Sequence, residues 1–215
     1  MSGSGAPLFD DAFRARLETL IRWRRDVRRF KPDPIAPDLV EDLLRLAALA
    51  PSVGLSQPWR FVSVDDPARR AAVRRNFEAA NAEALQACPD ERKALYAKLK
   101  LAGLDEAPRH LALFAEAQPE QGHGLGRRTM PETVAYSAVM AAHTLWLAAR
   151  AYGIGIGWVS ILDPARIAAI AEVPAGWRLV AYLCLGYPQE PDDTPELERA
   201  GWERRRPAEE MLIRR

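Results

Sequence analysis

Residues 24–30 read Arg-Arg-Asp-Val-Arg-Arg-Phe, a stretch in which four of the seven side chains are arginines. Residues 22–31 carry six cations and a single anion, Asp26, whereas an ordinary solvated face mixes the two signs more evenly. At a helix end, or in the turn after it, at least two of these guanidinium groups can converge. Converging guanidiniums bind phosphate well, because their planar donors form bidentate hydrogen bonds to its oxygens. Taken alone, the stretch also fits a basic helix end that contacts water.

The composition is that of an ordinary globular chain, and we predict one domain over residues 1–215, with a leader at residues 1–7. The 215 residues are 48% hydrophobic and 27% charged. A net charge of +1 argues against a general nucleic-acid or membrane-surface binder. Cys88 and Cys184 are far apart and in no metal-ligand spacing, which predicts a reducing compartment such as the cytoplasm and no metal site. No apolar run reaches the ~18 residues that a membrane span needs.

A second candidate site is the loop of residues 50–59, which reads Ala-Pro-Ser-Val-Gly-Leu-Ser-Gln-Pro-Trp. It follows a predicted helix with a buried apolar stripe and leads into a predicted strand over residues 60–64. Loops between elements often contact ligands, since their backbone groups are not all used in a ladder. A plain turn is an equally good interpretation of this segment by itself.

Two helical segments suggest contacts beyond the core. Residues 8–23 place apolar side chains at steps of three and four, so this helix packs either on its own domain or on a partner subunit. Residues 133–152 form the longest predicted helix, and its many small residues fit a dimer interface or a buried core helix. Residues 79–103 hold many charges and few bulky apolar residues, which indicates either a lid over the site or two solvated surface helices.

Glycines and prolines mark the remaining segments. Residues 153–160 read Gly-Ile-Gly-Ile-Gly-Trp-Val-Ser, and alternating glycines let a flat ligand or another strand approach the backbone closely. The three glycines of residues 122–126 lack the spacing of the dinucleotide fingerprint, so they predict no nicotinamide site. The tail at residues 189–215 is too polar to fold alone, and we predict an arm that wraps a second subunit and adds one arginine, not identified, to the phosphate site.

Taken in order, these stretches resemble the nitroreductase family. In that family the Arg-Arg-x-x-Arg stretch holds the phosphate of FMN, and Pro-Ser-x-x-x-x-Gln-Pro-Trp is a second flavin motif. The resemblance implies an α+β fold with a central mixed or antiparallel sheet flanked by helices, and a domain-swapped homodimer with a flavin site at each half of the interface. This chain has Asp26 where most members have Ser, and its second motif lacks the usual Asn. Both departures resemble one branch of the family, which consumes its own flavin.

Similarity to that branch implies an oxygen-dependent oxidoreductase that fragments reduced FMN to 5,6-dimethylbenzimidazole, the lower ligand of cobalamin, and erythrose 4-phosphate. Molecular oxygen is the implied co-substrate, and a separate flavin reductase the implied source of reduced FMN. The implied catalytic residues are Asp26 and Ser160, and neighbouring arginines are expected to favour the ionised form of Asp26. The implied flavin contacts are Arg24, Arg25, Asp26, Val27, Arg28, Ser52, Val53, Gly54, Gln57, Lys98, Leu101, Val159 and Ser160.

Two other functions fit parts of the same pattern. A conventional FMN-dependent NAD(P)H nitroreductase or flavin reductase would keep its flavin and turn over a nicotinamide. A protein that only sequesters flavin would bind it without chemistry. For Asp26 itself, the alternative to a catalytic role is a structural salt bridge with an arginine.

Overall fold

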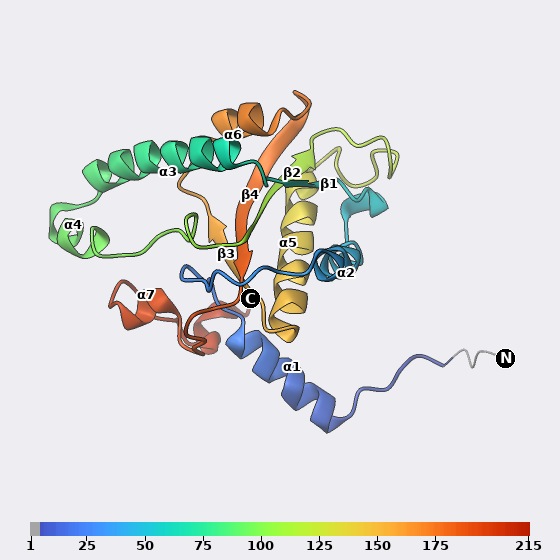
Figure 1. Ribbon diagram of the computed structural model, residues 1–215. Helices are drawn as coiled ribbons and strands as arrows, with labels where there is room; N and C mark the ends of the chain where they lie inside the picture. Colours follow the sequence, from blue (N-terminus) through green and yellow to red (C-terminus); the bar gives the residue numbers. More distant parts are fainter. Residues whose placement is uncertain (1–4) are drawn as a thin grey trace.

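The fold is organised around a four-stranded sheet with the strand order β1-β2-β4-β3 (Figure 1). The computed structural model describes residues 5–215, so residues 1–4 of the predicted leader lie outside the described part. The strands are β1 Trp59–Ser63, β2 Arg109–Glu116, β3 Gly155–Val159 and β4 Trp177–Gly186. All three pairings between neighbouring strands are antiparallel. The predicted α+β class and central sheet are thereby confirmed.

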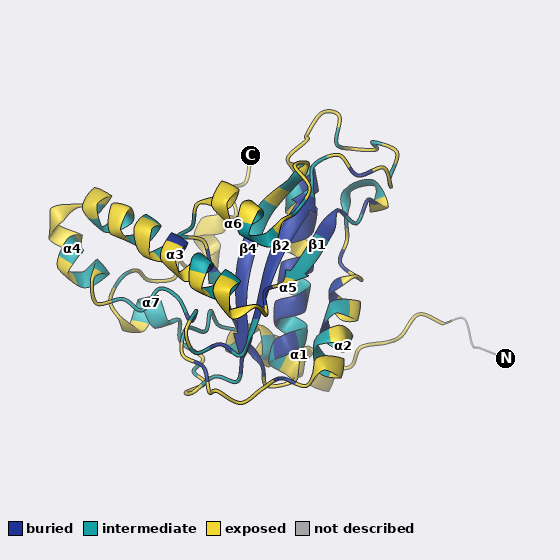
Figure 2. Ribbon diagram, turned by 45° about the horizontal axis from the view of Figure 1, so that its top comes forward, coloured by how far each residue is buried: buried dark blue, intermediate teal, exposed yellow. Residues whose placement is uncertain are grey.

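Helices cover both faces of this sheet, as Figure 2 shows. The α-helices are α1 Asp11–Trp23, α2 Pro37–Ala47, α3 Pro67–Ala87, α4 Asp90–Tyr96, α5 Thr133–Ala151, α6 Pro164–Ala171 and α7 Glu196–Arg199. Short 3-10 turns lie at η1 Val53–Leu55 and η2 Ala208–Met211. One core cluster joins α2 and α5 to the sheet, and a second joins α3 and α6 to its other face. No helix within residues 5–215 has the length and apolarity to cross a membrane.

Local sequence explains where several of these elements begin. The side chain of Asp66 accepts a hydrogen bond from the Arg69 N–H at 2.8 Å, and Asp163 accepts one from the Ala165 N–H at 2.9 Å. Each of these caps is followed by a proline in the first helical turn, where the missing N–H is not needed. Strand β2 is apolar without alternation because both of its faces are covered by core.

The arginine-rich stretch runs beside β3. Asp26 forms a parallel bridge with Ile156, and the Val27 N–H donates to the Ile156 carbonyl oxygen at 3.0 Å. A Cβ added to Gly157 would overlap the carbonyl oxygen of Val27, and one added to Gly155 would lie 2.6 Å from Cγ2 of Val27. Of the two interpretations of the alternating glycines, the structure therefore supports the approach of another chain segment at these two positions.

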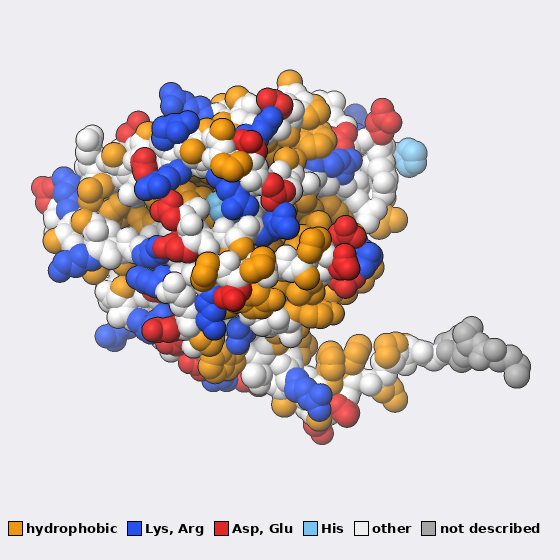
Figure 3. Space-filling view, in the orientation of Figure 1, with side chains coloured by type: hydrophobic (Ala, Val, Ile, Leu, Met, Phe, Trp, Pro, Cys, Tyr) orange, Lys and Arg blue, Asp and Glu red, His pale blue; other side chains and the backbone are white. Residues whose placement is uncertain are grey.

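Helix α1 stands out from the body, with its apolar side chains uncovered (Figure 3). Phe13, Leu17 and Ile21 are 44%, 40% and 50% exposed. The helix contacts α5, and Leu20 and Trp23 are half-buried, so its apolar face packs on its own domain in part. The rest of the face is open to another surface.

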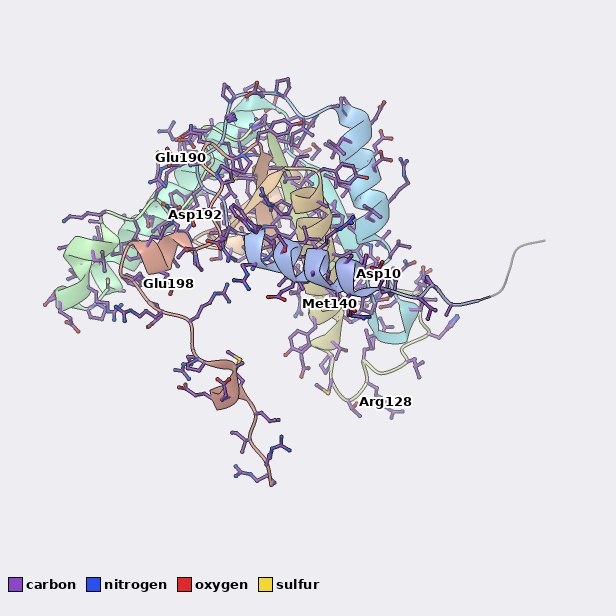
Figure 4. The ribbon with its side chains drawn as sticks, turned by 90° about the horizontal axis from the view of Figure 1, so that it is seen from below. Asp10, Arg128, Met140, Glu190, Asp192 and Glu198 are labelled. Carbon is purple, nitrogen blue, oxygen red and sulfur yellow. The ribbon has the colours of Figure 1, made fainter. Side chains whose placement is uncertain are left out.

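The C-terminal arm divides into two parts. Gln189 donates its backbone N–H to the carbonyl oxygen of Arg29 at 3.1 Å, and Glu196 pairs with Arg29, so the first part packs on its own chain. The prediction that the arm wraps a second subunit stays a prediction. Polar groups in this part of the arm pair with the arginine-rich stretch of the same chain. Residues 203–215 are all exposed and extend away from the body (Figure 4).

Candidate functional site

Asp26 is held on both of its carboxylate oxygens. Its Oδ1 accepts a hydrogen bond from the backbone N–H of Trp158 at 2.8 Å. Its Oδ2 accepts from Nε of Arg28 at 2.9 Å and lies 2.8 Å from Nη2 of the same guanidinium. Because the bridge to β3 fixes the backbone of this stretch, the carboxylate has one defined orientation. Its side chain remains 31% exposed, so a ligand can reach it.

Burial raises the pKa of the Asp26 carboxyl above its ordinary value, although Arg28 and the Trp158 N–H act in the opposite direction. The expected effect of a neighbouring arginine is present, since Arg28 lowers the pKa of Asp26, but burial outweighs it and the net direction is upward. The reason is that only one arginine pairs with this carboxylate, and surrounding protein removes more hydration than that pair replaces. A raised pKa brings a carboxyl closer to the range in which it can take up and return protons.

Arg28 forms hydrogen bonds with Asp26 and with the predicted lid. Besides its two contacts with the carboxylate, it donates through Nη1 to the carbonyl oxygen of Lys100 at 3.0 Å. Only 11% of its side chain is exposed. The sequence predicted that at least two of the guanidiniums converge, and the contacts of Arg28 are with Asp26 and Lys100, so its assignment to the FMN phosphate stays a prediction.

Arg24 and Arg25 instead meet an arginine from the arm. Burial lowers the pKa of both guanidiniums, and the nearby charge of Arg205 lowers both further. Arg24 lies over the ring of Trp146, with Cζ 4.8 Å from its centroid. Arg25 donates to the carbonyl oxygen of Asp193 through Nε at 2.8 Å. The charge of Arg205 acts on both guanidiniums, and that of Arg24 acts on Arg25, so these like charges form an environment that an anion stabilises.

Arg205 was not identifiable from the sequence. It lies in the run Arg204-Arg205-Arg206, which gives no reason to prefer one member. The first part of the arm packs on the arginine-rich stretch, and Arg205, which lies beyond that part, is the member of the run whose charge acts on Arg24 and Arg25. The basic run itself was the sequence signal for an arginine supplied by the arm.

A cavity of about 470 Å³ opens between the arginine-rich stretch and the arm. Arg25, Asp26 and Arg28 line it together with Trp146 of α5. Acidic residues of the arm also line it, including Glu190 and Asp192, which Figure 4 labels. Its volume lies within the range of about 300–1,000 Å³ that small-molecule sites occupy.

The second motif lies at a different place. Gln57 donates its N–H to Oγ of Ser52 at 3.1 Å, and Val53 donates its N–H to Oγ of Ser137 at 3.0 Å. A Cβ on Gly54 would lie 2.9 Å from the carbonyl oxygen of Leu125, so this loop packs against the glycine-rich loop of residues 122–126. None of residues 52–57, all within the described chain, lines the cavity beside Asp26. One chain thus does not bring the two flavin motifs together.

Of the remaining predicted contacts, Val159 and Ser160 follow Trp158 in the chain, and Lys98 and Leu101 belong to the lid. Val159 is buried in β3, and Ser160 follows it, exposed, two residues after the Trp158 N–H that binds Asp26. Lys98 is exposed and Leu101 half-buried, on either side of the Lys100 carbonyl that Arg28 contacts. The predicted lid at residues 79–103 begins inside α3 and includes α4.

Residues 21–187 match the model of the nitroreductase family, so the chain belongs to this family. It is 59% identical over 201 residues to the 5,6-dimethylbenzimidazole synthase of Rhodospirillum rubrum, covering 94% of this chain and 95% of that protein. A protein of the same name from Rhodobacter capsulatus is 49% identical over 201 residues, with 94% and 97% covered. These relatives confirm the predicted branch.

Solved structures agree on the fold. Oxidised iodotyrosine deiodinase bound to FMN and 3-iodo-L-tyrosine matches with a TM-score of 0.70 and 27% identity, covering 82% of this chain and 91% of that one. A nitroreductase-like protein from Bacillus cereus matches with a TM-score of 0.64 at 19% identity, covering 97% and 98% of the two chains. The predicted nitroreductase fold is confirmed.

Proposed function

We propose that this chain is a 5,6-dimethylbenzimidazole synthase, an oxidoreductase that consumes reduced FMN and molecular oxygen and releases erythrose 4-phosphate beside the benzimidazole. The relatives of that name support the product, and the FMN of the deiodinase structure supports a flavin ligand. The observation that carries the proposal is the Asp26 carboxylate, fixed by Arg28 and Trp158, in a cavity next to the cluster of Arg24, Arg25 and Arg205.

The residues present fit FMN. The cluster of Arg24, Arg25 and Arg205 carries like charges that a phosphate group would offset. The cavity beside it is large enough for a ring system and carries a carboxyl with a raised pKa. When bound, reduced FMN supplies both the electrons for oxygen and the carbon skeleton that is broken down.

Asp26 is the proton carrier in this proposal. Its Oδ1 is fixed by the Trp158 N–H, and its Oδ2 is the atom that takes up and returns a proton when Arg28 moves off it. Ser160 assists with its hydroxyl group. Arg28 positions the carboxylate, and its contact with Lys100 ties that position to the lid.

A homodimer completes the site. The loop of residues 52–57 lies away from the cavity of its own chain, and the apolar face of α1 is open. A second copy that covers α1 and brings its own 52–57 loop to the cavity accounts for both observations. The exposed residues 206–215, beyond Arg205, are available to extend along that copy.

Leu17→Asp is expected to convert the dimer into a monomer, because it places a charge in the centre of the apolar face of α1. Thr19→Asp is the matched control, since Thr19 lies on the opposite side of the same helix. Light scattering after size exclusion should give twice 23.9 kDa for the wild type and the control, and 23.9 kDa for Leu17→Asp. A monomeric wild type, or a Leu17→Asp variant that stays dimeric, contradicts the proposed interface.

Arg205→Ala is expected to weaken FMN binding roughly tenfold to a hundredfold while leaving riboflavin binding unchanged, because only FMN carries the phosphate. Arg206→Ala serves as the control with the same loss of charge one residue later. Titration calorimetry with the two flavins separates the phosphate contribution from the ring contribution. An equal loss for both flavins would mean that Arg205 acts on the ring or on folding.

The function itself is tested by incubating the protein with FMN, an external flavin reductase, NADH and air. The expected product is 5,6-dimethylbenzimidazole, identified by mass. Steady NADPH turnover with a nitroaromatic and no benzimidazole would instead identify a conventional nitroreductase. Simple reoxidation of the flavin would identify a sequestering protein.

A further inference from the structure

The lid segment has little to hold it in place. Asn76 and Gly103 are buried, but none of residues 77–102 between them is fully buried. The distal half of α3 and all of α4 project from the sheet (Figure 1), with teal and yellow surfaces in Figure 2. A segment with so few buried contacts opens at low free energy unless something outside it holds it closed.

Trp202 of the arm supplies such contacts. Its carbonyl oxygen accepts a hydrogen bond from Nη1 of Arg92 at 2.6 Å, and its ring lies under the same guanidinium, with Cζ 5.1 Å from the centroid. The ring of Tyr96 meets it edge-on at 6.1 Å. The Tyr96 hydroxyl donates to Oδ1 of Asn81 at 2.8 Å. This Trp202 latch (Asn81, Arg92, Tyr96 and Trp202) joins α3, α4 and the arm.

Both ends of the latch lead to the proposed flavin site. On the lid side, α4 runs into the segment whose Lys100 carbonyl binds Arg28. On the arm side, Asp193 contacts Arg25, and the Trp202 N–H donates to the carbonyl oxygen of Leu197 at 2.8 Å. Arg205 follows Trp202 by three residues, so their Cα atoms are at most about 11 Å apart. Fixing Trp202 therefore restricts the lid and Arg205 together.

We propose that Trp202 is a positioning residue that couples the lid to the arm, so that lid closure and delivery of Arg205 to the flavin phosphate occur as one event. The coupling rests on the proposed flavin site, whereas the latch itself rests only on the contacts above. An aromatic ring suits this role, since it offers one face to a guanidinium and an edge-on contact to Tyr96. The hydrogen bond from Arg92 to the backbone carbonyl oxygen of Trp202 does not depend on the Trp202 side chain, so most substitutions at Trp202 retain it.

Trp202→Ala tests the proposal in the full-length chain with two readouts. The first is limited trypsin digestion without flavin, followed by mass spectrometry of cleavage after the lid lysines Lys93, Lys98 and Lys100. The expected result is cleavage at least tenfold faster than in the wild type. The second is the ratio of FMN to riboflavin affinity, which is expected to fall roughly tenfold because Arg205 is no longer held in place.

Arg92→Ala breaks the latch from the exposed lid side and is expected to reproduce both changes, which guards against a folding defect specific to Trp202. Trp202→Phe keeps an aromatic ring and should retain most of the protection. Arg205→Ala should lower the FMN preference but leave the lid protected. The proposal is overturned if Trp202→Ala and Arg92→Ala are digested at the wild-type rate, or if the lid is released with the FMN preference unchanged. Failure of the proposed function is distinguishable, because wild-type protein would then form no 5,6-dimethylbenzimidazole, whereas the digestion and affinity readouts do not depend on product formation.

Discussion

Asp26→Asn is expected to lower the rate of 5,6-dimethylbenzimidazole formation by about 10²–10⁴-fold while flavin still binds. An asparagine keeps the size of the side chain and an oxygen for the Trp158 N–H, but it cannot take up and return a proton. The arginines proposed to hold the phosphate are unchanged. The measurement is the single-turnover yield of the benzimidazole from reduced FMN in air, with flavin binding measured in parallel.

The pH dependence gives this prediction a second readout. Since burial raises the pKa of Asp26, the carboxylate becomes protonated on acidification at a higher pH than a free aspartate would. If the ionised form is the base, the wild-type rate falls through that raised pKa, and the residual rate of Asp26→Asn lacks this limb. Asp33→Asn, an exposed aspartate seven residues later, is the control. A normal rate in Asp26→Asn would mean that the carboxylate serves only as the salt-bridge partner of Arg28.

Local patterns were sufficient for much of the fold. The pairs Asp66-Pro67 and Asp163-Pro164 are local signals for two helix starts, because a cap and a first-turn proline act within a few residues. The helix predicted over residues 133–152 is α5, and the strand predicted over residues 60–64 overlaps β1. The acid among the arginines was also visible, and the structure places it in a cavity.

The rest of the site depends on contacts between distant residues. Arg28 was expected to join Arg24 and Arg25, but its donors are taken by Asp26 and by Lys100, which lies 72 residues away. The raised pKa of Asp26 follows from surrounding protein that no local spacing records. Trp202 contacts Arg92 of α4 and the charge of Arg205 acts on Arg24, and a polar tail carries no periodicity that would predict either placement.

Gly157→Ala is expected to destabilise the fold by about 2–4 kcal/mol and to abolish product formation. The added Cβ would overlap the carbonyl oxygen of Val27, and a backbone atom cannot rotate away as a side chain can. The arginine-rich stretch must then move off β3. That movement breaks the 3.0 Å hydrogen bond from the Val27 N–H to Ile156 and the 2.8 Å bond from the Trp158 N–H to Asp26. Urea denaturation and the benzimidazole assay measure the two effects.

Gly176→Ala is the matched control, because a Cβ there meets no heavy atom within 4 Å. Its stability should stay within about 0.5 kcal/mol of the wild type, as for an ordinary surface substitution. The comparison separates two explanations for a glycine in this segment. If Gly157→Ala lost activity with unchanged stability, the methyl group would be blocking a ligand. If stability and activity are lost together, the glycine is there so that the chain segment carrying Asp26 can lie against β3. The Asp26 carboxylate and the edge of the sheet then form one structural unit.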